Sequence, residues 1–348
     1  NRRLFRRALR YLDYALLPKN RYTEYFEKYR PSMVFATDIF NENDVQVMRE
    51  ARARGIKIVG MVRSWDNVTS HGLNRIVPDK LIVNTPNIKE EAIRYNDARP
   101  ENIETVGIPH YDRYVAGLRV SREELFKQLD LDPNKKTVFF APPGDIYTEN
   151  NPVSTQVIKE LGKLDNVQLI IRLYMVGEVN LGDIKPIPGK IAIDAPRKHI
   201  NFVEADLAPK EDAHLADLLY HSDAVVAVAS TLAIDAAVLG KPVTFIGFDG
   251  EPRPYWRSLR RYYDFDHQDY LVRTGGVQLA RTMEELVGSV KKYLRDPSAN
   301  KENRKKVADE FCWKLDGQSG ARAAHFLLRE LTSTGLTLPL KNFNISKS

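Results

Sequence analysis

The sequence predicts an α/β fold of two domains, each built around a parallel sheet. The main evidence is the stretch 223–247, DAVVAVASTLAIDAAVLGKPVTFIG. It begins as a valine-rich apolar run, changes to helical periodicity after Ser230-Thr231, and becomes apolar again after Gly240 and Pro242, which end the helix. A strand–helix–strand unit that is apolar on every side belongs inside a parallel sheet. The second observation is the length of 348 residues, which favours two domains over one core.

The composition is that of an ordinary globular protein, with 43% hydrophobic and 28% charged residues. No run of about 18 apolar residues occurs, so we expect no membrane-spanning segment. The single cysteine, Cys312, excludes an internal disulfide framework and predicts a location in the reducing cytoplasm.

The basic excess is confined to the first 30 residues, which hold nine Lys/Arg and three Asp/Glu, whereas the rest of the chain holds 43 of each sign. This balance argues against a nucleic-acid partner. Residues 2–17 are predicted to form a helix with arginines on one face and leucines on the other. Two interpretations stay open. The helix either packs on the first domain with a solvated basic face, or attaches peripherally to anionic lipid on the inner face of the plasma membrane.

The first domain is predicted to span residues 1–120. After a short amphipathic stretch at 22–29, apolar strands alternate with helices, as in a parallel α/β sheet. The predicted strands are 33–37, 56–62, 81–84 and 103–106, and the predicted helices are 44–54 and 88–95.

The second domain is predicted to span residues 121–332, and a polar tail follows at 333–348. Residues 251–275 are rich in Arg, Tyr and Asp and show no clear period. The predicted strands are 137–141, 167–172, 200–203, 224–228 and 243–246, and the predicted helices are 154–161, 213–220, 232–239, 283–294, 303–313 and 320–331.

Polar loops follow three strands of the first domain, at the edge where α/β sheets keep their ligands. They are residues 37–41 (TDIFN), 63–72 (RSWDNVTSHG) and 107–112 (GIPHYD). The second loop is the most informative, because we expect so many polar and aromatic residues to contribute nothing to a core.

The residues around the strand–helix–strand unit resemble the second-domain core of GT-B glycosyltransferases. They look most like the branch that contains CDP-glycerol glycerophosphotransferases and related surface-polysaccharide transferases. The resemblance rests on Asp223, Ser230-Thr231, Asp235, Gly240-Lys241-Pro242 and Phe248-Asp249, and on SWDN-x-TS-x-G at 64–72, G-x-P-x-x-D at 107–112 and DG-x-[SA]-x-x-R at 316–322.

This resemblance implies a GT-B-like fold, in which two Rossmann-like domains with parallel sheets face a central cleft. The first domain would lie on the acceptor side, and the second would bind the nucleotide donor. GT-B first domains open with a strand and a glycine-rich turn, and neither precedes residues 2–17. We therefore expect the upstream strands to have been removed or to be absent from this family.

The resemblance further implies an inverting, metal-independent glycosyltransferase. It would move a sugar from a nucleotide-sugar donor to a cell-envelope or capsular polysaccharide or a lipid-linked acceptor. No cofactor besides that donor substrate is expected, and no Walker loop, HExxH motif or cysteine pair for a metal occurs. Three alternatives stay open: a CDP-glycerol glycerophosphotransferase of teichoic-acid type, a UDP-sugar 2-epimerase, and a non-catalytic subunit that binds sugar nucleotides.

Such a transfer needs a base that takes the proton of the acceptor hydroxyl. The first-domain loops offer Asp66, His71, Asp38 and His110, and the first two lead. The alternative role of the two aspartates is to stabilise a turn or a helix cap with their carboxylates. The alternative role of the histidine in the third loop is to pack at the domain junction.

The transfer also needs positive or N–H groups at the leaving diphosphate. A glycine would bring backbone N–H groups close to the diphosphate, and the branch often carries a basic residue at the end of an apolar strand. An aromatic residue would lie against the nucleotide base, and hydroxyl and acidic residues would contact phosphate, sugar or ribose. For the two hydroxyl residues, an ordinary helix cap is the alternative. The candidates in this order are Gly144, Arg172, Phe202, Ser230, Thr231 and Asp235.

Overall fold

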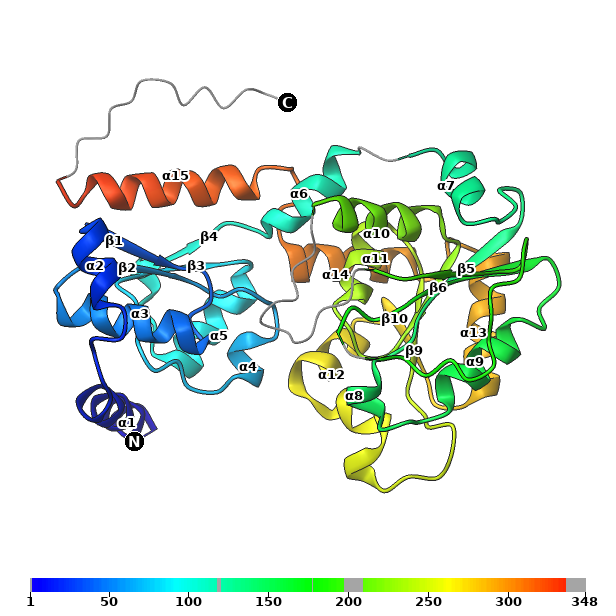
Figure 1. The fold of residues 1–348 in the computed structure, drawn as a ribbon, viewed down its shortest axis with the longest axis horizontal. Helices are drawn as coiled ribbons and strands as arrows, with labels where there is room; N and C mark the ends of the chain where they lie inside the picture. The colour runs from blue at the N-terminus through cyan, green and yellow to red at the C-terminus, as the bar shows by residue number, and fades with distance from the viewer. Residues whose placement is uncertain (1, 118–119, 177, 197–208, 336–348) are drawn as a thin grey trace. The chain divides into compact units, whose positions relative to one another are not determined.

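The computed structural model describes residues 2–117, 120–176, 178–196 and 209–335. The chain forms two compact units, one of residues 1–112 with 313–348 and one of residues 113–312 (Figure 1). Each unit contains one parallel sheet, so the predicted α/β fold is confirmed. Within the described ranges, every helix is too short or too polar to traverse a lipid bilayer.

The sheet of the first unit has four strands in the order of the chain, β1-β2-β3-β4. Parallel neighbours need a crossover, and here short helices supply it. Asn41 caps α3 by accepting the Asn43 N–H, and Thr85 caps α5 by accepting the Ile88 N–H. The elements are α1 (Arg2–Leu16), α2 (Thr23–Tyr29), β1 (Met33–Ala36), α3 (Glu42–Ala53), β2 (Lys57–Met61), α4 (Asn67–Ser70), β3 (Lys80–Val83), α5 (Pro86–Asn96), η1 (Pro100–Asn102), β4 (Ile103–Thr105) and α15 (Ser319–Thr332).

The last helix, α15, packs on this first sheet, whereas the sequence placed it in the second domain. Its Phe326 lies in a buried cluster with Val59, Ile82 and Val106. Figure 1 shows α15 along one face of the sheet and α3 and α5 on the opposite face. The crossover helices cover only one face of a four-stranded sheet, so the other face takes its apolar cover from the distant end of the chain.

Helix α1 docks on the first unit through its basic face. Arg6 and Arg10 donate hydrogen bonds to the carboxylate of Asp97, with Nε–Oδ2 at 3.0 Å and Nη1–Oδ2 at 2.8 Å. On the same interface, Arg49 of α3 pairs with Asp13 of α1 at 2.5 Å. Burial raises the pKa of Asp97, but the hydrogen bonds from the two arginines outweigh it and leave this pKa below its usual value.

The apolar face of α1 therefore points away from the domain. None of its described residues is buried, and Leu4, Phe5 and Leu16 are 62%, 66% and 77% exposed. The interpretation in which the leucine face packs on the domain and the basic face is solvated is therefore wrong for Arg6 and Arg10, whereas Arg2, Arg3 and Arg7 stay exposed. The reason is that Asp97 and the carbonyl groups of Asn74 and Asn96 form a cluster of acceptors, which guanidinium groups satisfy and leucines do not.

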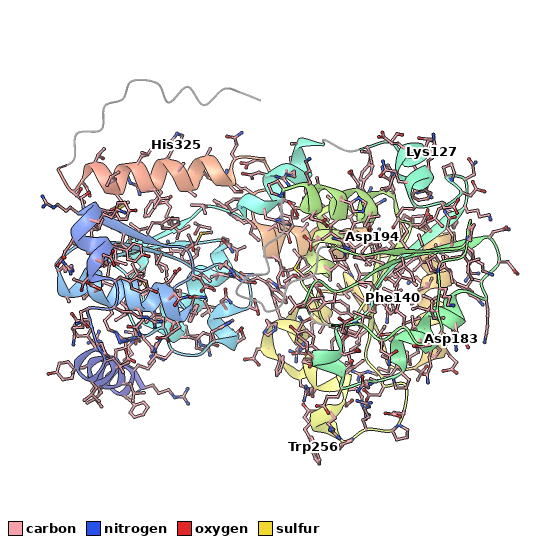
Figure 2. The ribbon with its side chains drawn as sticks, viewed as in Figure 1. Lys127, Phe140, Asp183, Asp194, Trp256 and His325 are labelled. Atoms are coloured by element: carbon pink, nitrogen blue, oxygen red, sulfur yellow. The ribbon has the colours of Figure 1, made fainter. Side chains whose placement is uncertain are left out.

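The sheet of the second unit has six parallel strands in the order β10-β9-β8-β5-β6-β7. Val138, Phe140 and Val226 belong to its buried core, and Figure 2 shows Phe140 inside the unit. The strands are β5 (Lys136–Ala141), β6 (Val167–Arg172), β7 (Ile191–Asp194), β8 (Ala224–Ala227), β9 (Val243–Ile246) and β10 (Val277–Ala280). The helices are α6 (Pro109–Ala116), which spans the boundary of the units, α7 (Arg122–Gln128), α8 (Asp145–Thr148), α9 (Val153–Leu161), α10 (Pro209–His221), α11 (Leu232–Val238), α12 (Asp266–Arg273), α13 (Met283–Arg295) and α14 (Lys301–Cys312).

The predicted strand–helix–strand unit is confirmed as β8, α11 and β9, and β8 pairs with both β5 and β9. The sequence missed the short strands β7 and β10, which lie at the two edges of the sheet. It also found no period in residues 251–275, where two 3₁₀ helices precede α12: η2 (Tyr255–Arg257) and η3 (Leu259–Asp264). A 3₁₀ helix has three residues per turn, so a 3.6-residue period cannot reveal it. The predicted strand 200–203 lies outside the described residues.

Candidate functional site

The carboxyl ends of β1 and β2 bring two of the predicted loops together. Asp38 follows β1 and Arg63 follows β2, and Arg63 Nε lies 3.9 Å from Asp38 Oδ2. The rings of Phe40 and His71, from the same two loops, have centroids 5.7 Å apart. Parallel neighbours end at the same edge of a sheet, so two of the four candidate bases share one surface.

The loop 63–72 is ordered by its own side chains. Trp65 and Val68 are buried, so the expectation that this loop contributes nothing to a core is wrong for these two residues. One turn of helix, α4, forms inside the loop, and the Asn67 side-chain oxygen accepts the Ser64 N–H at 2.6 Å. These contacts fix the backbone of the loop and therefore the positions of its polar residues.

Asn67 holds His71 in one tautomer. Because the Asn67 oxygen is occupied by the Ser64 N–H, the amide nitrogen faces His71 Nδ1, at 3.1 Å. An amide nitrogen only donates, so Nδ1 accepts, and a neutral ring carries its proton on Nε2. The exposed His71 therefore presents an N–H group outward. This geometry favours a hydrogen-bond donor over the predicted base.

The role of Asp66 as a base stays a prediction. Its backbone carbonyl accepts the Ser70 N–H at 2.9 Å and its Oδ2 accepts the Ser70 hydroxyl at 3.4 Å, but in the described part of the loop its side chain forms no hydrogen bond to the first N–H groups of α4. Asp38, by contrast, accepts its own Phe40 N–H at 3.0 Å, the geometry of a turn carboxylate.

His110 lies on a different element, the first turn of α6. Its side chain is exposed, and its ring stands edge-on to that of Tyr111, with centroids 4.9 Å apart. Its role as a base stays a prediction.

Asp112, two residues further on, caps helix α15. Its Oδ1 and Oδ2 accept the N–H groups of Ser319 and Gly320, at 3.0 and 2.8 Å. Gly107 has a φ of +87°, and an added Cβ would lie 2.5 Å from Ser319 Oγ, so only glycine fits there. The G-x-P-x-x-D and DG-x-S-x-x-R stretches, which the sequence presents separately, are therefore two halves of one structural joint.

In the second unit, Gly144 precedes α8 in a crowded position. A Cβ there would lie 2.7 Å from Cδ1 of the Tyr174 ring, so the glycine provides space. The next N–H group, that of Asp145, already donates to the Glu178 carbonyl at 2.9 Å. The contact of this turn with a diphosphate stays a prediction.

Arg172 ends β6 in a buried network of charges. Its guanidinium pairs with Asp194, at the end of β7 (Figure 2), and lies 3.1 Å from Glu211 of α10. His214 Nε2 lies 2.9 Å from Asp194, and this hydrogen bond raises the pKa of His214. Burial raises the pKa of Asp194, but the hydrogen bond with His214 and the charge of Arg172 together have the larger effect. The pKa of Asp194 is therefore below its usual value, and this carboxylate stays ionised.

The predicted donor turn follows β8. Ser230 Oγ accepts the Leu232 N–H at 3.2 Å, and Thr231 is exposed at the start of α11. Tyr263 holds the turn in place, since its hydroxyl accepts the Ala229 N–H at 3.1 Å and donates to the Ile246 carbonyl at 2.8 Å. The sequence missed Tyr263 because it comes from the 3₁₀ segment without a period.

Asp235 points into the second unit. It is buried near Tyr114, whose pKa is raised far above its usual value by burial and by the charge of this carboxylate. The geometry thus favours a structural role over contact with a ligand. Phe202, the predicted neighbour of the nucleotide base, lies outside the described residues.

A model of the family described as CDP-glycerol:poly(glycerophosphate) glycerophosphotransferase matches residues 70–329. A search of curated proteins found no match.

Three solved structures illustrate the likeness of fold. A UDP-GlcNAc 2-epimerase from Neisseria meningitidis bound to UDP-GlcNAc is 15% identical, with a TM-score of 0.58, over 88% of this chain and 79% of that one. The S. aureus MnaA–UDP structure is 12% identical, with a TM-score of 0.59, over 89% and 78%. The wall teichoic acid polymerase TagF with CDPG is 15% identical, with a TM-score of 0.53, over 90% and 76%. The predicted GT-B-like fold is confirmed.

Proposed function

Because the chain belongs to the CDP-glycerol:poly(glycerophosphate) glycerophosphotransferase family, we propose that it transfers glycerol phosphate from CDP-glycerol to a teichoic-acid-type polymer of the cell envelope. The observation that carries the proposal is the family match across three quarters of the chain, residues 70–329. The match includes the end of the first-domain loop 63–72 and the whole donor turn after β8. The TagF structure with CDPG supports it as a protein of the same fold.

Sugar transfer from a nucleotide-sugar donor is the second candidate. It is favoured by the N. meningitidis structure, in which a protein of this fold holds UDP-GlcNAc. Both candidates share the nucleotide diphosphate and differ in the group that is moved. An identity of 15% carries only the fold, so the epimerase activity of that protein is not assigned to this chain.

In the proposed reaction, an acceptor hydroxyl attacks the phosphorus atom that bears glycerol. A new P–O bond forms, the P–O bond to CMP breaks, and the hydroxyl proton passes to a base. Asp66 takes this proton, and the outward N–H of His71 donates to the phosphoryl oxygen on which charge builds up. For the second unit taken by itself, we propose that the turn at Ser230 and Thr231 binds the phosphate of the nucleotide through its N–H groups and hydroxyls.

The nucleotide preference tests the proposal directly. We expect CDP-glycerol to raise the melting temperature, because a ligand at about 100 times its Kd adds about 2.7 kcal/mol to the free energy of unfolding. CDP-ethanolamine, which has the same nucleotide, and UDP-GlcNAc serve as matched controls, and release of CMP with a glycerol phosphate oligomer reports transfer. If only UDP-GlcNAc raises the melting temperature, the result favours sugar transfer. If a nucleotide raises the melting temperature but no turnover is detected, the result favours a non-catalytic subunit that binds nucleotides.

We also propose that α1 attaches the protein to a lipid surface, with its apolar row as the inserting face. The exposed Leu4, Phe5, Leu9 and Leu12 lie on one side of the helix, opposite the docked Arg6. Arg2 and Arg7 of the same helix are also exposed and can meet anionic headgroups.

Vesicle flotation tests this attachment. We expect the wild-type protein to float with anionic vesicles, and the triple variant Phe5→Ser, Leu9→Ser, Leu12→Ser to stay unbound with an unchanged melting temperature. Tyr25→Ser on α2, also an exposed large side chain, is the matched control. If the triple variant floats as the wild type does, or if it unfolds more easily, the row serves a protein contact instead.

A further inference from the structure

A pocket of about 460 Å³ lies in the second unit, at the carboxyl ends of β9 and β10. It is lined by Gly247 after β9, by Arg281 after β10, and by Arg260, Tyr263 and Asp264 of η3. The predicted donor residues follow β5, β6 and β8, so the pocket lies at the opposite side of β8 from most of them. Its volume is in the range of sites for small ligands.

The charges of this pocket suit an anion. Within the described ranges, neither Arg260 nor Arg281 forms an ion pair with a carboxylate, and Arg260 Nε donates only to Ser258 Oγ, at 3.1 Å. Of the two acids in the lining, Asp269 pairs with Arg273 at 2.6 Å, whereas Asp264 accepts only the neutral Tyr255 hydroxyl at 2.6 Å and keeps its charge, so two guanidinium groups outnumber one unpaired carboxylate. Both guanidinium groups are therefore left to bind a ligand.

Tyr263 connects the pocket to the donor turn. Tyr263 is one of the lining residues, and its hydroxyl accepts the N–H of Ala229, the residue directly before Ser230. A single side chain thus lies between this pocket and the turn predicted to hold the donor phosphate. Beside the pocket, Tyr255 and Trp256 of η2 are 56% and 69% exposed, and Figure 2 shows Trp256 at the outer end of this segment.

We propose that this pocket binds a phosphodiester of the acceptor polymer and so holds the growing chain beside the donor. The inference rests on the proposed function, and it names the subsite that recognises the acceptor. Guanidinium groups bind phosphate oxygens through paired, charge-assisted hydrogen bonds, and Asp264 with Tyr255 offers partners for a glycerol hydroxyl. The exposed aromatic rings next to the pocket provide apolar faces for the carbon backbone of the polymer.

The test measures binding without catalysis. A short synthetic oligomer of glycerol phosphate is titrated into the full chain in a calorimeter, with no donor present. We expect the double variant Arg260→Gln, Arg281→Gln to bind it roughly tenfold more weakly or worse. The matched control is Lys291→Gln, Arg295→Gln, which removes two exposed charges from α13 and should bind as the wild type does. In the transfer assay, the double variant should raise KM for the oligomer and leave kcat and the Kd of CDP-glycerol unchanged.

Each outcome separates this inference from the proposed function. If transfer occurs and the double variant keeps the wild-type KM and Kd for the oligomer, the pocket assignment fails and the function stands. If the wild-type protein neither binds CDP-glycerol nor transfers it, but binds the oligomer through these two arginines, the function fails and the pocket stands. The last measurement is binding of the wild-type protein and the double variant to phosphatidylglycerol vesicles. Loss of vesicle binding in the double variant, with oligomer binding intact, would assign the arginines to lipid and overturn the proposal.

Discussion

Replacing Asp66 with Asn is expected to lower turnover by roughly 10²-fold or more while leaving donor affinity nearly intact. The substitution keeps the shape of the side chain and removes its capacity to take a proton. Its effect is measured as kcat for CMP release, and donor affinity is measured separately by calorimetry. Asp38→Asn is the matched control, because its carboxylate already accepts the Phe40 N–H in a turn.

His71 distinguishes the two chemical roles in this loop. His71→Ala should also lower turnover by roughly 10²-fold, because it removes a donor to the developing charge. His71→Gln should recover part of that loss, since the Gln amide supplies an N–H group but cannot act as a base. Full activity in Asp66→Asn, with no recovery of turnover in His71→Gln, would make the histidine the base.

The second large effect is expected on stability. Asp112→Ala removes both acceptors from the first N–H groups of α15 and takes a negative charge away from the start of a helix. We expect a loss of about 2 kcal/mol or more in the free energy of unfolding, because a cap alone contributes about 1 kcal/mol and partly buried N–H groups are left unpaired. Urea unfolding followed by circular dichroism measures it, and Asp112→Asn, which keeps one acceptor, should lie in between.

Asp309→Ala is the control for the lost charge. This carboxylate is exposed on α14 and pairs only with Lys305 among the described residues, so its removal should change stability by a few tenths of a kcal/mol. Equal midpoints for Asp112→Ala and Asp309→Ala would show that the joint between Asp112 and α15 contributes nothing.

Much of the fold follows from the sequence alone. The change of period at Ser230-Thr231 places β8, α11 and β9, and the alternation from residue 33 to residue 106 places all four strands of the first sheet. The carboxyl edge with Asp38 and the loop 63–72 also follows, because parallel strands end together. These features depend on local propensity and on burial of whole segments, and the spacing of apolar residues along the chain indicates both.

Only the tertiary structure decided which partner each face meets. Periodicity shows that the arginines of α1 share a face, but the acceptors at Asp97 turned that face inward and left the leucines outside. Likewise, α15 is amphipathic wherever it packs, and the uncovered face of the first sheet with the cap from Asp112 determined its place. The tautomer of His71 depends on the contact of its Nδ1 with Asn67, and Ser70 Oγ lies 3.0 Å from the same atom. Each of these outcomes depends on a specific pairing between distant groups, and a periodic pattern specifies that a face exists but not what lies against it.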